Sequence, residues 1–163
     1  MSMQVLKAGL LTTVQDGGRH GLRHLGVVSC GAMDPVALAL ANGLVGNRGG
    51  EAALEITVLG PQLAFESAAL IALCGARFDA RIGGEPLPLD RPVLVAKQSK
   101  LKVGRALLGS RAYLAVAGGI ATPPVLGSRS TCLPAGFGGL EGRALRAGDG
   151  LPLVQSSSDF ALT

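Results

Sequence analysis

Glycine and proline recur at short intervals in this sequence, and their spacing limits the length of the helices and strands that the chain can form. The 163 residues include 25 glycines and 9 prolines, yet 48% of residues are hydrophobic. The segment EITVLG alternates, with Leu54, Ile56 and Val58 on one face, and Gly60-Pro61 ends it. Further short apolar segments are QLAFES, ALIALCG, RFDARI, PVLVAKQ, KLKVG and YLAVAGG. Such segments favour a β-sandwich or β-barrel built as one domain.

One segment, MDPVALALANGLVGN, departs from the β pattern. Asp34 can cap a helix, Pro35 suits its first position, and Gly46-Asn47 supplies a stop signal. The face expected to be apolar consists of Ala37, Leu40, Ala41 and Leu44. The sequence therefore predicts a mainly β fold with one principal helix beginning near Asp34. A hairpin is expected at Gly83-Gly84.

Composition excludes several classes of function. The chain has a formal net charge of +4, but aromatic residues make up only 3% and Trp is absent, which disfavours stacking on nucleic acid bases. The apolar runs are too short to span a membrane. The three cysteines, Cys30, Cys74 and Cys132, are isolated and odd in number, and the N-terminus has no export signal. A cytoplasmic location is expected.

The stretch from Thr12 to Pro35, TTVQDGGRHGLRHLGVVSCGAMDP, concentrates glycine and polar residues. Gln15 and Asp16 offer oriented polar groups, and Arg19 suits a carboxylate or phosphate. Two interpretations remain open: a binding wall with Arg19 as the principal anion contact, or a connector held by an Asp16–Arg19 salt bridge. The spacing fits neither a P-loop nor a G-x-G-x-x-G dinucleotide site.

Other groups in this stretch carry weaker signals. His20 and His24 have i, i+4 spacing, but Gly21 disfavours a helix between them, and no metal site is predicted in this chain. Cys30 has no base paired with it in sequence, so a nucleophilic role is disfavoured.

A second polar cluster lies in GSRSTCLPAGFGGLEGRAL, from Gly127 to Leu145. Hydroxyl groups beside Arg129 and free backbone amides suit an anion such as a carboxylate, bicarbonate or phosphate. The alternative is a polar surface loop.

Taken together, five ordered segments resemble the KipA family, also called allophanate hydrolase subunit 2 or biotin-dependent carboxyltransferase-like proteins. They are TTVQDGGRHG, GAMDPVALALANGLVGN, ALEITVLGPQLAF, RAYLAVAGGI and GSRSTCLPAGFGGLEGRAL. The resemblance implies a cyclophilin-like β-barrel over residues 1–163, with this domain as the N-terminal half of a longer family member. The final QSSSDFALT is expected to be a frayed tail or the start of a further segment.

The resemblance also carries over residues by motif. Asp16, Arg19 and Asp34 become candidate catalytic residues. Candidate substrate-binding or anion-binding residues are Gln15, Gly18, Met33, Asn42, Ser128, Arg129 and Ser130. Cys30 departs from the small hydroxyl residue usual at its position.

The function implied is that of one subunit in an ATP-dependent complex that hydrolyses the lactam 5-oxoproline to glutamate. Its partners would be a KipI-type subunit and a third subunit, and phosphorylation of the lactam carbonyl oxygen would create a leaving group. One alternative is carboxyl transfer from biotin to urea, with biotin carried by another domain. Another is a non-catalytic module that binds a KipI-type kinase inhibitor.

Overall fold

Antiparallel strands make up most of the computed structural model, which describes residues 1–154; the predicted tail 155–163 lies outside the described residues. The strands are β1 (Ser2–Lys7), β2 (Leu11–Gln15), β3 (Ala53–Thr57), β4 (Gln62–Phe65), β5 (Ala69–Ile82), β6 (Glu85–Pro86), β7 (Val93–Val95), β8 (Lys100–Val116) and β9 (Gly150–Pro152). A 3-10 turn (Arg23–Leu25) and the helix α1 (Pro35–Leu44) complete the elements. The prediction of a mainly β fold with one principal helix is confirmed.

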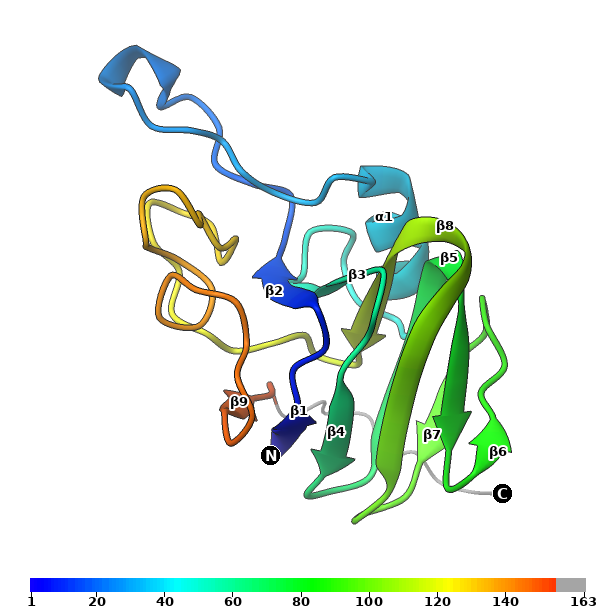
Figure 1. Cartoon of the computed structure of the whole chain (residues 1–163). Coiled ribbons are helices and arrows are strands. Elements are labelled where there is room, and N and C mark those ends of the chain that lie inside the picture. Colours follow the sequence, from blue (N-terminus) through cyan, green and yellow to red (C-terminus); the bar gives the residue numbers. More distant parts are fainter. Residues whose placement is uncertain (155–163) are drawn as a thin grey trace.

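The strands join into one strongly curled sheet. Its main path runs β2-β3-β8-β4-β1-β9, and β5 pairs with β6, β7 and β8. Figure 1 shows β5 and β8 as long ribbons that bend over together, which gives the sheet the form of a half-barrel. This curl is consistent with the cyclophilin-like barrel that the family resemblance implies.

Two long strands replace four of the expected short ones. β5 joins the segments ALIALCG and RFDARI, and β8 joins KLKVG and YLAVAGG. The expectation of separate strands was wrong because Gly75 and Gly109, at φ 108° and 80°, bend the backbone without ending the pairing. The β5–β8 register shifts between Gly75 and Arg77, where the ribbon turns.

Two hydrophobic clusters lie on opposite faces of the central strands. Residues such as Leu54, Leu73 and Leu114 belong to the cluster inside the curl. The cluster beneath α1 consists of Ala37, Leu38, Ala41, Val45, Ala53, Ala72, Cys74, Tyr113, Ala115 and Ala117. Small side chains prevail there, so the helix can approach the sheet closely.

The start of α1 is as predicted, but its buried face is not. Asp34 caps the helix and Pro35 is its first residue, while Leu40 is 49% exposed and Leu38 is buried. The face of Ala37, Leu40, Ala41 and Leu44 was therefore partly wrong, because the orientation of the helix is set by the alanine-lined sheet. Val58 also leaves its expected face: β3 ends at Thr57, and Val58 has φ 61° and is 44% exposed.

The ends of the described chain are tied into the sheet. β1 lies between β4 and β9, and the sequence patterns had indicated neither β1 nor β9. The hairpin at Gly83-Gly84 is confirmed by the pairing of Ile82 with Glu85. Within residues 1–154, no helix has the length and apolar character needed to cross a membrane.

Candidate functional site

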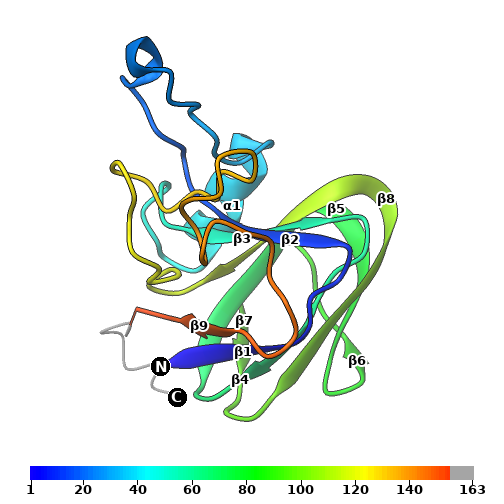
Figure 2. The same cartoon turned by 60° about the vertical axis from the view of Figure 1, so that its left-hand side comes forward.

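Two loop regions far apart in the sequence meet beside β2. The segment between β2 and α1 projects from the sheet, with the 3-10 turn near its tip, and the loops that follow β8 lie next to its base (Figures 1 and 2). Backbone hydrogen bonds fix this contact, including Thr131 N–H to Val14 O at 2.9 Å. The meeting point of the loops, formed by Asp16, Arg19, Ser128, Arg129 and Ser130, is here called the loop junction.

The Asp16 carboxylate is the centre of the loop junction. Its Oδ1 accepts hydrogen bonds from the Ser128 hydroxyl at 2.5 Å, the Ser130 hydroxyl at 2.6 Å and the Gly18 N–H at 2.8 Å. Its Oδ2 accepts from the Arg129 N–H at 2.6 Å. With the residue only 8% exposed, Asp16 joins both loops through one buried carboxylate.

These donors also decide the ionisation of Asp16. Burial by itself would raise the pKa of the carboxyl, but the hydrogen bonds from Ser128, Ser130, Arg129 and Gly18 together lower the pKa below its ordinary value. Asp16 is therefore ionised at neutral pH and is a weak base.

The Arg19 side chain holds the second loop by donating hydrogen bonds to backbone carbonyl oxygens of that loop. The residue is 2% exposed, and its Nε donates to Val125 O at 2.9 Å, while Nη2 donates to Ser130 O at 2.7 Å and Ser128 O at 3.3 Å. The guanidinium lies 4.7 Å from the Phe137 ring centroid. Its Nη1 is buried and has no hydrogen-bond partner among residues 1–154.

Glycine is required at two close backbone approaches in this region. Gly18 has φ 84°, and a Cβ there would lie 2.8 Å from Cys30 O in the returning limb of the same loop. A Cβ on Gly138 would overlap Ser130 O and the Arg19 guanidinium. Both positions permit a close approach that a larger residue would prevent.

A second group of predicted residues lies at the entry to α1. Asp34 Oδ1 accepts from Val36 N–H at 3.1 Å and Ala37 N–H at 3.0 Å, and Asp34 N–H donates to the Tyr113 hydroxyl at 2.8 Å. The Tyr113 hydroxyl donates to Glu55 Oε2 at 2.7 Å. Burial, followed by the hydrogen bond to Glu55, raises the pKa of Tyr113 well above its ordinary value, so the phenol stays protonated.

Glu55 links the helix entry to the sheet. Its Oε2 also accepts from Met33 N–H at 2.9 Å, and Oε1 lies 3.7 Å from Arg111 Nε. A pocket of about 250 Å³ opens next to these groups, lined by Met33, Asp34, Ala76, Gly109, Ser110 and Arg111. Asp34, which is exposed at its surface, and Arg111 give this pocket groups of opposite charge.

Of the remaining predicted residues, Gln15 and Arg129 lie at the loop junction, whereas Asn42 lies on α1. Gln15 is 6% exposed and its amide nitrogen donates to Thr131 O at 3.2 Å, close to the loop junction. Arg129 Nε donates to Thr122 O at 2.7 Å. Asn42 lies on the far part of α1, where its amide donates to Glu51 O at 2.8 Å and accepts from Asn47 at 2.8 Å.

The structure thus brings the first and second predicted loops together, but places Met33, Asp34 and Asn42 on a separate side around α1. Sequence reasoning missed Glu55, Tyr113 and Arg111. Alternation in EITVLG placed Glu55 opposite Leu54 and Ile56, and nothing local indicated that a helix would cover that face. No Asp16–Arg19 salt bridge is formed.

Both histidines and Cys30 lie in the loop between β2 and α1, with Cys132 next to Cys30, whereas Cys74 lies on β5 beneath α1. His24 is exposed, and His20 Nε2 is 2.9 Å from Gly17 O. Within the described part of the chain, no group of three or more His, Cys, Asp or Glu residues is arranged to hold a metal ion. Burial, with a contribution from the neighbouring Cys132 thiol, raises the pKa of Cys30 to about 11.

A curled β half-barrel with polar loops at one end is the architecture found in a known family. Residues 25–162 match the family model described as carboxyltransferase domain, subdomain A and B. The chain belongs to this carboxyltransferase domain family, and the resemblance drawn from its five motifs is confirmed.

Curated relatives and solved structures support the same family assignment. A 5-oxoprolinase subunit of Escherichia coli (strain K12) is 46% identical over 157 residues, which cover 96% of this chain and 51% of that protein. Urea amidolyase of Saccharomyces cerevisiae is 38% identical over 159 residues, or 97% of this chain and 9% of that protein. The crystal structure of Kluyveromyces lactis urea amidolyase has a TM-score of 0.93 and 41% identity, covering 94% of this chain and 9% of that one.

The chain spans about half the length of the 5-oxoprolinase subunit it matches and a small part of the urea amidolyases.

Proposed function

We propose that this protein acts as a subunit of an ATP-dependent 5-oxoprolinase complex, which hydrolyses the lactam 5-oxoproline to glutamate. The observation that carries the proposal is the 46% identity with the Escherichia coli 5-oxoprolinase subunit over 96% of this chain. The lactam is a poor electrophile, and transfer of a phosphoryl group from ATP to its carbonyl oxygen gives water a better centre to attack. The partners would be a KipI-type subunit and a third subunit, and the location would be the cytoplasm.

Within this proposal, Asp16 and Arg19 act mainly by positioning the loops. Their contacts are with Ser128, Ser130 and main-chain groups, and both side chains are buried. The Nη1 group of Arg19 supplies one donor for an incoming anion if the neighbouring loop shifts. The catalytic roles expected for Asp16, Arg19 and Asp34 remain predictions.

Asp34 is better placed to contact a substrate directly. Its Oδ1 caps the helix, and the carboxylate lies at an open pocket that also presents Arg111. We assign the pocket at the helix entry as the candidate surface for the polar end of the substrate. Met33, 68% exposed, would form its apolar edge.

The second candidate function is carboxyl transfer from biotin to urea. It is favoured by the match to a carboxyltransferase domain and by the TM-score of 0.93 with a urea amidolyase. In that case biotin would be delivered by another domain. A regulatory module that only binds a KipI-type partner is the remaining alternative.

The experiment that separates these functions uses the protein purified together with its KipI-type and third subunits. We expect ATP hydrolysis that depends on 5-oxoproline and releases glutamate in equal amount. When a biotin-carrying carboxylase domain is added, ATP hydrolysis that depends on urea and bicarbonate would instead establish the carboxylase. A stable complex that responds to neither substrate would support the regulatory module.

Arg19→Lys in that complex tests the role of the loop junction. A lysine keeps the charge but cannot reach three carbonyl oxygens with a planar fork. Because lysine loses these contacts, the unfolding temperature should fall in either case; if Arg19 also contacts an anion, kcat/KM falls as well, by about fivefold to a hundredfold. A lower unfolding temperature with unchanged kinetics would assign Arg19 to positioning alone.

A further inference from the structure

A second pocket, which shares no lining residue with the pocket at the helix entry, has no role in the proposed function. Its volume is about 580 Å³, and its walls come from β1, β4, β8 and the loops next to them. Lining residues are Lys7, Ala8, Gly9, Leu59, Gly60, Gln62, Lys102, Val103, Gly104 and Ala147. None of them belongs to the predicted site or to the pocket lined by Asp34 and Arg111.

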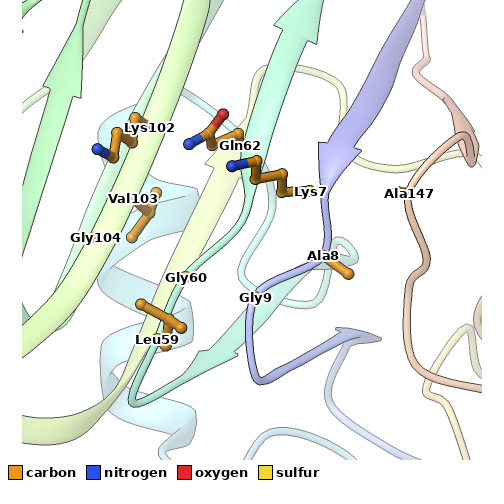
Figure 3. A pocket seen from close by; sticks show the side chains of 10 residues that line it. All are labelled: Lys7, Ala8, Gly9, Leu59, Gly60, Gln62, Lys102, Val103, Gly104 and Ala147. Carbon is orange, nitrogen blue, oxygen red and sulfur yellow. The ribbon is translucent and has the colours of Figure 1, made fainter.

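The pocket has one polar end and one apolar end. Figure 3 shows Lys7 reaching toward Gln62, with Lys102 on the other side of Gln62, whereas Leu59 and Ala8 lie toward the opposite end. All of the charged side chains that line it are cations. Such a division suits a ligand with an anionic group joined to an apolar body.

Strand register places the three polar side chains in a row. Lys7 of β1 pairs with Gln62 of β4, and Gln62 pairs with Lys102 of β8. Adjacent strands are about 4.8 Å apart, so the Lys7 and Lys102 backbones are separated by about 10 Å. Two flexible four-carbon stems can bring both ammonium groups to one anion above Gln62.

The charges of this row are not neutralised by protein carboxylates. Among residues 1–154, the salt bridges include neither Lys7 nor Lys102. Lys102 also pairs across the sheet with Arg81, but the Arg81 guanidinium is 3.3 Å from Asp79 Oδ1 and so has its own carboxylate partner. The Lys7 and Lys102 charges therefore remain available to a bound anion.

We propose that this pocket binds a small organic carboxylate with a short aliphatic body. The carboxylate lies between the Lys7 and Lys102 ammonium groups and accepts a hydrogen bond from the Gln62 amide. The aliphatic body packs on Leu59, which is 48% exposed, and on Ala8. Lysine offers a mobile point charge, so the ammonium groups select for negative charge and the apolar wall selects for the body.

Hexanoate is a suitable probe, because it combines one carboxylate with a short alkyl chain. The full chain is titrated with hexanoate while the backbone N–H signals of Gly9, Gly60 and Gly104 are followed by NMR. We expect saturable shifts centred on these three glycines. Hexan-1-ol lacks the charge and inorganic phosphate lacks the body, so each should bind at least about tenfold more weakly.

The variant Lys7→Gln/Lys102→Gln should bind hexanoate about tenfold or more weakly, because two charged contacts are lost. Lys100→Gln is the matched control, since Lys100 is an exposed cation on the same strand but does not line the pocket. If the double variant does not fold, Lys102→Gln alone should still weaken binding at least about threefold. Equal binding of hexanoate and phosphate, unshifted glycine signals, or equal hexanoate affinity in the wild type and the lysine variants would overturn the proposal.

Discussion

The Asp16 carboxylate accepts four hydrogen bonds from both loops while almost fully buried. In Asp16→Asn, the amide nitrogen cannot accept a hydrogen bond, so at least one donor loses its partner. We expect the free energy of unfolding to fall by about 2–4 kcal/mol, measured by urea denaturation at pH 7. Asp79→Asn is the control, because Asp79 is about half exposed and its loss should cost under about 0.5 kcal/mol.

The same carboxylate should make stability depend on acid pH. Its pKa is lower in the folded protein than the ordinary value of 3.8, so its contribution is present above that value and disappears as pH falls through the folded pKa. The stability difference between wild type and Asp16→Asn should therefore be smaller at pH 3 than at pH 7. A difference that stays constant over this range would show that Asp16 is not held ionised by the loop junction.

Cys30 should react slowly with alkylating agents. Burial raises its pKa to about 11, so at pH 9 only about 1% is thiolate, compared with half of an ordinary thiol of pKa 9.0. We expect its rate of carbamidomethylation by iodoacetamide, followed by mass spectrometry, to rise about tenfold per pH unit from pH 8 to 10. Cys30→Ser identifies the modified site, and a rate at pH 8 equal to that of free cysteine would contradict the raised pKa.

At the residue scale, the motifs identified polar residues that meet in the structure, but not the individual contacts that each of them makes. Asp16, Ser128 and Ser130 were predicted in two separate motifs, and the structure brings them together. Arg19 was expected to meet an anion or Asp16, yet it contacts carbonyl oxygens of the second loop. Because every residue carries a backbone carbonyl oxygen, no sequence pattern could show which of them Arg19 would contact.

Asp34 has two possible roles at the element scale: it caps α1, and it lines the pocket at the helix entry. Asn caps a helix about as well as Asp, whereas Ala cannot. Asp34→Ala should therefore lower the free energy of unfolding by about 1 kcal/mol, and Asp34→Asn by less than about 0.5 kcal/mol. If the carboxylate contacts substrate, Asp34→Asn should also reduce kcat/KM of the assembled complex at least about tenfold.

The comparison of the two Asp34 variants distinguishes capping from chemistry. Calorimetric unfolding of the isolated chain measures the contribution of Asp34 to capping. Turnover by the complex measures its contribution to the reaction. Wild-type turnover in Asp34→Asn would leave Asp34 as a helix cap only.

Among the helices and strands, features set by neighbouring residues were predicted correctly, whereas features set by contacts distant in sequence were not. The capping residue and proline at the start of α1 act within one turn, so the beginning of the helix was correctly predicted. Burial of Leu38 rather than Leu40 depends on how the helix packs on alanines of three strands. β1 and β9 were missed because they are stabilised by pairing with each other and with β4, not by a local pattern.

For the whole molecule, five ordered motifs predicted the family, and the match over residues 25–162 confirms it. They did not reveal the pocket of Lys7 and Lys102, because its polar row depends on the register of three strands. The molecule thus presents a polar loop junction, a separate polar pocket at the helix entry and a cationic pocket on the sheet.

The last prediction concerns what the chain does alone: it should fold but show no hydrolysis of 5-oxoproline with ATP. Ser128 and Ser130 donate to Asp16, whose lowered pKa makes it a weak base. Burial raises the pKa of Cys30 to about 11 and that of Cys74 to about 12, so neither thiol is ionised at neutral pH. These described side chains therefore supply no activated nucleophile.

Glutamate release at pH 7.5 is measured for the isolated chain and for the complex with its KipI-type and third subunits. A cooperative thermal unfolding transition verifies that the isolated chain is folded. We expect its rate to equal that of a buffer blank, and activity to appear only when the partners are added. Turnover by the folded, isolated chain at the rate of the complex would show that the residues described above form a complete active site.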